Sequence, residues 1–106
     1  MSFVDFVTKA SPKIIGVGLN YLKLAKETGT SIPEVPLLFL KPWSCLTYMP
    51  KTVSLPRAKI HRIVHEIEFG VFISKEGVNI KKEDANRHIG GYFIGVDISD
   101  RTLLKI

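Results

Sequence analysis

The sequence predicts an α+β fold in which most strands are antiparallel. With 106 residues, of which 45% are hydrophobic and 24% charged, the chain has the composition and the length of one globular domain. Short apolar runs, punctuated by glycine and proline, recur along it, whereas helical patterns are few and short. The strands are too few to close a large barrel, and the last one leaves an edge that needs a partner.

Composition excludes several classes of protein. No apolar run approaches the roughly 20 residues that span a bilayer, so we expect no membrane partner. A single cysteine, Cys45, excludes an internal disulfide framework and fits a reducing compartment. The net charge of +5 is scattered, and its densest cluster, 57–62, is short and lacks interleaved aromatic residues. We therefore expect a solvated loop there and no nucleic-acid partner.

The first half of the chain predicts two strands and one helix. An amphipathic turn over 1–10 ends at Ser11-Pro12, and a buried strand over 13–18 ends in glycines. A short helix follows over 21–28, with Asn20 as its cap and Gly29 as its stop. A second buried strand is expected over 37–40, after a loop bracketed by prolines.

The second half predicts two longer strands. Residues 43–62 are expected to be irregular, apart from a strand near 52–54. A strand is expected over 64–74, followed by a turn at 75–77 and a polar helix over 81–88. The next strand follows Gly90-Gly91 and ends at Asp97. A helix is then expected to begin at Arg101, with Ser99 or Asp100 as its cap.

Three carboxylates stand where one divalent cation can collect them. Glu66 and Glu68 are two residues apart in a predicted strand, so their side chains project from the same face, and Asp97 can reach that point from a neighbouring strand. Oxygen ligands suit Mg²⁺, Mn²⁺ or Ca²⁺. Gly70 lies on the same face and leaves room for a ligand or for close approach of backbone. The residues expected to point the other way, into a core, are Ile67, Phe69 and Val71.

The same residues also admit a plainer interpretation. Paired glutamates on one strand face often form a solvated surface, and an aspartate often ends a strand. From the residue pattern alone both interpretations of Glu66, Glu68 and Asp97 stay open.

Four motifs in register resemble the fumarylacetoacetate hydrolase family, in particular its acylpyruvase and oxaloacetate decarboxylase branch. They are Lys13-Ile-Ile-Gly-Val-Gly-Leu-Asn-Tyr21, Pro36-Leu-Leu-Phe-Leu-Lys-Pro42, His65-Glu-Ile-Glu-Phe-Gly70, and Gly90-Gly-Tyr92 with Asp97 and Arg101. The match covers residues 13–106, with 1–12 as an N-terminal extension. It implies a single partial domain over 1–106 with a mixed, mostly antiparallel β-roll, C-terminally truncated.

The resemblance also implies chemistry. It makes Glu66, Glu68 and Asp97 the ligands of Mg²⁺ or Mn²⁺ and places Arg101 near the substrate carboxylate. The substrate would be a small 2-oxo acid or 1,3-dicarbonyl compound, such as an acylpyruvate or oxaloacetate, cleaved at a C–C bond through a metal-bound enolate. Lys41 would touch substrate or form a hinge salt bridge, and His65 is expected in packing or behind the ligands rather than as a ligand. The complete fold would be a homodimer, in mitochondria or cytosol.

Two departures from the family pattern stand out. The hydrolases use a histidine and a glutamate to orient the attacking water; here Leu24 takes the histidine's place, and Glu27 keeps the glutamate's. Leu19 stands in place of an arginine and Leu104 in place of a glutamine. The match also covers only the N-terminal half of the family domain. We therefore expect impaired or absent catalysis by this chain alone; the alternative is a non-catalytic metal-binding relative or a truncated isoform that acts as a subunit.

Overall fold

The computed structural model describes residues 5, 13–48, 50–55 and 61–102. The chain divides into two compact units, Met1–Val53 and Ser54–Ile106, each described here by itself. All strands in these ranges pair antiparallel, with short helical segments between them, which confirms a mixed fold with antiparallel strands. Within the described ranges, no helix is long and apolar enough to cross a bilayer. The predicted turn over 1–10, apart from Asp5, and the helix expected after Arg101 lie outside the described residues.

The first unit contains a two-stranded sheet. Strand β1 (Ile14–Gly18) pairs antiparallel with β2 (Leu37–Lys41), so that Ile14 faces Lys41 and Gly18 faces Leu37. A short 3₁₀ helix, η1 (Trp43–Cys45), follows β2. Both strands were predicted, but the prediction that they are buried was wrong. Four of the five residues of β2 are exposed, and β1 alternates between half-buried and exposed residues. A two-stranded sheet covers little of its own apolar surface.

Helix α2 (Leu22–Thr28) connects the two strands of this unit. It ends at Gly29 as predicted, where φ of 66° gives the left-handed conformation that glycine adopts without strain. The helix start differs from the prediction, because Tyr21 rather than Asn20 is the N-cap and makes no side-chain capping bond. Ala25, 3% exposed, is the one fully buried hydrophobic residue in the described part of the chain.

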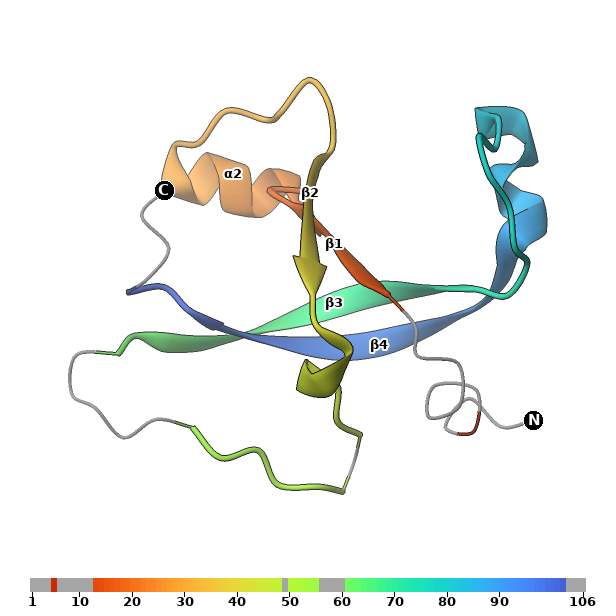
Figure 1. Ribbon diagram of the computed structural model, residues 1–106. Helices are drawn as coiled ribbons and strands as arrows, with labels where there is room; N and C mark the ends of the chain where they lie inside the picture. Colours follow the sequence, from red (N-terminus) through yellow and green to blue (C-terminus); the bar gives the residue numbers. More distant parts are fainter. Residues whose placement is uncertain (1–4, 6–12, 49, 56–60, 103–106) are drawn as a thin grey trace. The chain divides into compact units, whose positions relative to one another are not determined.

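The second unit is a long hairpin whose strands are joined through a 3₁₀ helix (Figure 1). Strand β3 (Ile63–Ile73) pairs antiparallel with β4 (Ile89–Asp100), with a register shift between Phe72 and Ile73. The connecting helix, η2 (Lys82–His88), replaces the helix expected over 81–88. Strand β4 begins earlier than predicted and takes in both glycines at 90–91. No strand forms at 52–54, where residues 51–55 have no regular structure.

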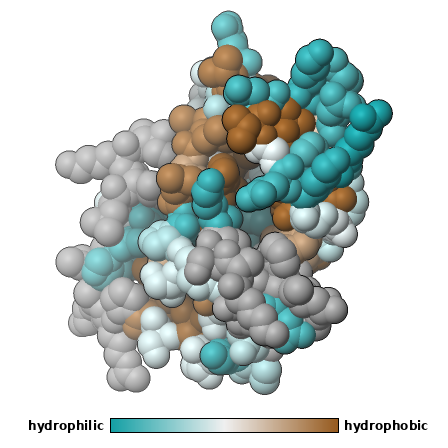
Figure 2. Space-filling model, turned by 45° about the vertical axis from the view of Figure 1, so that its right-hand side comes forward, coloured by the Kyte–Doolittle hydropathy of each residue, from teal (hydrophilic) through white to brown (hydrophobic). Residues whose placement is uncertain are grey.

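The hairpin has two unlike faces. Ile67, Phe69 and Val71 project from the face opposite the glutamates, as predicted, but they are 61%, 62% and 43% exposed, so the expectation of a core there was wrong. Phe69 stacks on Tyr92 of β4 with ring centroids 5.3 Å apart. Exposed hydrophobic side chains are visible as brown areas on the molecular surface (Figure 2).

Candidate metal centre

The three predicted carboxylates lie on one face of the β3–β4 hairpin. Glu66 stands directly opposite Asp97 in the antiparallel register, and Glu68 stands opposite Gly95. Residues opposite each other in such a ladder share a face, and so do residues two apart along a strand. All three carboxylate residues are half-buried, whereas the neighbours that alternate with them along both strands are mostly exposed.

The carboxylates share a face without closing around one point. Among the described residues, no group of three histidine, cysteine, aspartate or glutamate side chains is close enough to hold a metal ion. Glu66 is instead engaged by Arg101, whose Nη2 donates to its Oε1 at 3.2 Å. This pair is partly exposed, with 35% of the arginine side chain and 30% of the glutamate side chain accessible. The structure therefore brings Arg101 to the first of the three carboxylates.

The residues on this face have the donor chemistry that a hard cation requires. Carboxylate oxygens are the preferred ligands of Mg²⁺ and Mn²⁺. The three carboxylate residues belong to two cross-strand pairs on this face, Glu66 with Asp97 and Glu68 with Gly95. The absence of a side chain at Gly95 leaves space beside Glu68 and Asp97, because a Cβ built there would meet only Phe93, at an ordinary 3.6 Å. The donor set and this space fit a cation, provided that the carboxylates turn toward it.

The surroundings of Gly70 on the carboxylate face differ from the prediction. A Cβ built on Gly70 would lie 2.2 Å from Cζ of Phe93, so the phenyl ring covers the glycine. Phe93 is the direct cross-strand neighbour of Gly70. The expected close approach exists, but the approaching group is a side chain, and the room for a ligand at Gly70 was wrongly predicted. Alternation counted back from Asp97 places Phe93 on the carboxylate face, and this signal in the sequence could have predicted the covering of Gly70.

The other candidate residues have these places within their own units. His65 projects from the apolar face of β3, opposite to Glu66 and Glu68. In the first unit, Lys41 ends β2 opposite Ile14. Glu27 lies on the exposed side of α2, 61% accessible, with Lys23 Nζ at 3.9 Å from its carboxylate. Leu24 lies one turn earlier in the same helix and is half-buried.

A second cluster closes the end of the hairpin beyond Arg101. Asp100 accepts a hydrogen bond from His61 Nδ1 and another, at 2.9 Å, from the backbone N–H of Thr102. Burial opposes ionisation of Asp100, but the hydrogen bonds from His61 and Thr102 outweigh it and hold the pKa of this carboxyl below its ordinary 3.8. Sequence spacing gave no signal for this pair, because its partners are 39 residues apart and meet only through the register of the ladder.

Comparison with known proteins identifies relatives of the whole described region. The profile of the family "Fumarylacetoacetate (FAA) hydrolase C-terminal" matches residues 13–106. An uncharacterized protein of Methanocaldococcus jannaschii is 45% identical over 91 residues, which cover 86% of this chain and 38% of the relative. The mitochondrial oxaloacetate tautomerase of Arabidopsis thaliana is 35% identical over 102 residues, covering 96% of this chain and 45% of the relative.

A further relative and a solved structure match the same region of the chain. The mitochondrial oxaloacetate decarboxylase of Dictyostelium discoideum is 38% identical over 92 residues, covering 84% of this chain and 41% of the relative. The crystal structure of a Mycobacterium smegmatis protein assigned as HpcE superposes with a TM-score of 0.77 and 35% identity over 89% of this chain and 33% of the other. The chain thus spans about two fifths of the length of the curated relatives it matches. With a family profile that covers nearly all of it, the chain belongs to the fumarylacetoacetate hydrolase family.

Proposed function

We propose that this chain supplies the cation-binding face of a protein that acts on a small 2-oxo acid, either oxaloacetate or an acylpyruvate. Glu66, Glu68 and Asp97 are the ligands of Mg²⁺ or Mn²⁺, and Arg101 receives the carboxylate of the substrate. The observation that carries the proposal is the direct pairing of Glu66 with Asp97 across the ladder, with Glu68 on the same face and Arg101 already at Glu66.

The cross-strand pairing of two carboxylates needs a compensating charge. Like charges directly opposite in an antiparallel pair destabilise it by about 0.2–1 kcal/mol. Arg101 offsets part of this cost at Glu66, and a divalent cation beside Gly95 would add positive charge next to Glu68 and Asp97. The cation supplies Lewis acidity, which stabilises negative charge that develops on a substrate oxygen.

Arg101 is suited to the carboxylate of the substrate by shape as well as by charge. Its planar guanidinium can donate two parallel hydrogen bonds to a planar carboxylate. One nitrogen, Nη2, is directed to Glu66 in this structure, which holds the group beside the ligand row. The substrate carboxylate would therefore be bound next to the cation and not far from it.

The residue at position 24 separates the possible reactions. Hydrolysis needs a group that orients water and takes its proton, and Leu24 can do neither. Enol–keto tautomerisation and decarboxylation of oxaloacetate need no attacking water. We therefore place tautomerisation or decarboxylation ahead of acylpyruvate hydrolysis, which is impaired or absent in this chain. The names of the Arabidopsis thaliana and Dictyostelium discoideum relatives support that order, and their mitochondrial designation supports a mitochondrial setting.

Isothermal titration calorimetry with Mn²⁺ and Mg²⁺ measures cation affinity and so tests the cation site directly. The Glu68→Ala variant should bind at least about tenfold more weakly than wild type, because it removes a charged ligand. The matched control is Glu83→Ala, which removes an acidic side chain from η2 of the same unit. Equal affinities for wild type and both variants would contradict the assignment of Glu68.

Activity measurements then distinguish an enzyme from a binding relative. Enol–keto conversion and decarboxylation of oxaloacetate, and hydrolysis of acetylpyruvate, are followed with Mg²⁺ present. Turnover of oxaloacetate that Glu68→Ala loses and Glu83→Ala keeps would support the enzyme. Metal binding without turnover of either substrate would support the alternative, a non-catalytic metal-binding relative or subunit, which Leu24 also favours.

A further inference from the structure

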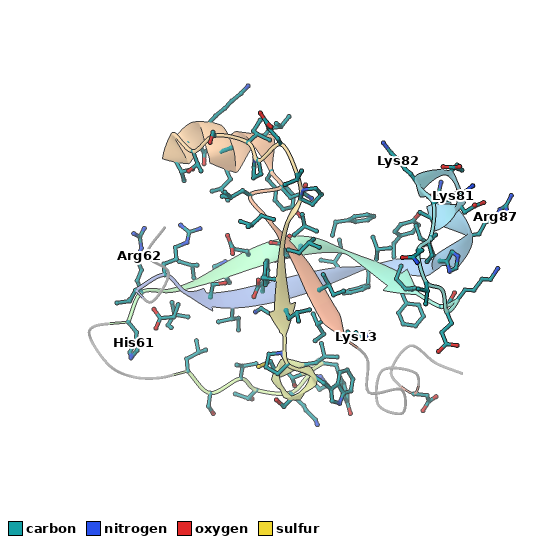
Figure 3. The ribbon with its side chains drawn as sticks, turned by 45° about the horizontal axis from the view of Figure 1, so that its top comes forward. Lys13, His61, Arg62, Lys81, Lys82 and Arg87 are labelled. Carbon is teal, nitrogen blue, oxygen red and sulfur yellow. The ribbon has the colours of Figure 1, made fainter. Side chains whose placement is uncertain are left out.

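The end of the β3–β4 hairpin next to Arg101 is tied together by backbone and side-chain bonds. The Arg101 N–H donates to the carbonyl of Arg62 at 2.9 Å, and the Arg62 N–H donates to Oγ1 of Thr102 at 2.6 Å. His61 and Asp100 add a side-chain link between the same two segments. His61 and Arg62 lie at one end of the hairpin, and Lys81 and η2, which contains Lys82 and Arg87, lie at the other (Figure 3).

Asp100 uses both of its oxygens in this link. Oδ2 is bonded to His61 Nδ1, and Oδ1 accepts the backbone N–H of Thr102 at 2.9 Å. Because an ionised carboxylate only accepts hydrogen bonds, the ring nitrogen of His61 donates. The His61 and Asp100 side chains are 23% and 16% exposed, so they are better shielded from water than the Arg101–Glu66 pair. A charge-assisted bond in this setting restrains the residues that carry it.

The His61–Asp100 bond lies on the face of the sheet opposite to the carboxylates. Asp100 pairs with Ile63, and this pair belongs to the face of Ile67, not to that of Asp97. The next residue, Arg101, reaches back to Glu66 on the carboxylate face. The side-chain bonds of Asp100 therefore fix the backbone on both sides of Arg101 without occupying the candidate site.

We propose that His61 and Asp100 are positioning residues for Arg101. The pair closes the open end of the hairpin, holds residues 101–102 against Arg62, and so keeps the guanidinium at the carboxylate row. This inference rests on the proposed function only for its consequence, namely tighter binding of a substrate carboxylate. The structural part concerns the order of Arg101 and is tested without metal, substrate or turnover.

Amide hydrogen exchange, followed by NMR on the full chain, measures that order. Asp100→Asn removes the charge and retains the size of the side chain, and it should accelerate exchange of the Arg101 and Arg62 amides on the order of tenfold, as expected for the loss of a charge-assisted hydrogen bond. Amides in the middle of β3 and β4 should change little. The matched control is Asp84→Asn, which removes an aspartate that pairs with Arg87 at 3.0 Å in η2 of the same unit.

Substitutions at His61 supply a second, independent measurement. In His61→Asn the amide nitrogen takes the approximate place of Nδ1 and can still donate to Asp100, whereas His61→Leu cannot. Slow exchange at Arg101 in His61→Asn with fast exchange in His61→Leu supports the proposal. If Asp100→Asn does not fold, these two variants decide the question. Exchange at Arg101 that matches the Asp84→Asn control overturns the proposal, as does uniform acceleration along the hairpin, which would indicate general stabilisation.

The consequence for binding is measured with Mn²⁺ and oxalate, a planar dicarboxylate. His61→Leu should weaken oxalate binding to the Mn²⁺-loaded chain on the order of tenfold and leave Mn²⁺ affinity unchanged, with His61→Asn close to wild type. Equal oxalate affinity in all three overturns the link between the pair and ligand binding. If wild type binds no Mn²⁺, the proposed function fails, and the exchange experiment still decides whether His61 and Asp100 order Arg101.

Discussion

Substitution of Gly70 by alanine tests the way in which Phe93 covers the carboxylate face. A Cβ at this position would lie 2.2 Å from Cζ of Phe93 and within 2.5 Å of both Cε atoms, so the ring must move. Overpacking of a closed core costs about 1–3 kcal/mol, but the far end of the Phe93 ring, 39% exposed, can turn aside, so we expect the low end, about 1 kcal/mol. Alanine recovers about 0.5–1 kcal/mol through reduced backbone entropy, since Gly70 has no positive φ. We therefore expect a net loss of about 0–0.5 kcal/mol in the free energy of unfolding.

Gly91→Ala provides the matched control on the same face of the hairpin. Gly91 also has no positive φ, and a Cβ there would meet nothing within 4 Å, so this variant should be neutral or slightly stabilised. The backbone term is common to both variants, and the difference between them isolates the displacement of the Phe93 ring. The ring displacement of about 1 kcal/mol should place the urea midpoint of Gly70→Ala about 0.3–1 M below that of Gly91→Ala, for an m-value of about 1–3 kcal/mol/M. Equal midpoints would refute the close packing of Phe93 on Gly70.

Three other predictions concern the two ends and the apolar face of the hairpin. Because the pKa of Asp100 is lowered in the folded state, its contribution is present above pH 3.8 and is lost as pH falls through the folded value; NMR shifts of the Thr102 amide should report that loss. Phe69→Ser should lower binding of the dye ANS, since this ring is 62% exposed, and should cost about 0.5–1.5 kcal/mol through the lost Tyr92 stack. Arg101→Lys keeps the charge but loses the planar fork, so oxalate affinity of the Mn²⁺-loaded chain should fall about tenfold with Mn²⁺ affinity unchanged.

Local sequence signals located most of the regular structure. Alternation of side chains identified β3 and the shared face of Glu66 and Glu68, and Gly29 marked the end of α2 through its left-handed backbone. The helix start was less predictable, because the N-cap is Tyr21, whose side chain makes no capping bond and so leaves no capping signal in the sequence. Propensity alone also predicted a strand near 52–54, but no strand among the described residues pairs with this segment.

Features that depend on register were not predictable from one strand at a time. The pairing of Glu66 with Asp97, rather than with a neighbour of Asp97, follows from how β3 and β4 align. The same alignment sets Phe93 over Gly70 and brings Asp100 to His61. The residue types of the candidate site were predictable from the sequence, but which of these residues contact each other depends on the register of β3 and β4. The contact of Arg101 with Glu66 also depends on register, since 35 residues separate the two in the sequence.

The two faces of the hairpin explain why cation binding and folding would be coupled here. The apolar face leaves Phe69 and its neighbours exposed, so burial contributes little to holding β3 on β4. On the carboxylate face, the like charges of Glu66 and Asp97 stand opposite each other, and Arg101 bonds to Glu66. A cation bound only by the folded ladder adds about 2.7 kcal/mol at a hundredfold excess over its dissociation constant. On the proposed assignment, cation binding and hairpin formation would be linked, because the three ligands share one face only in the folded ladder.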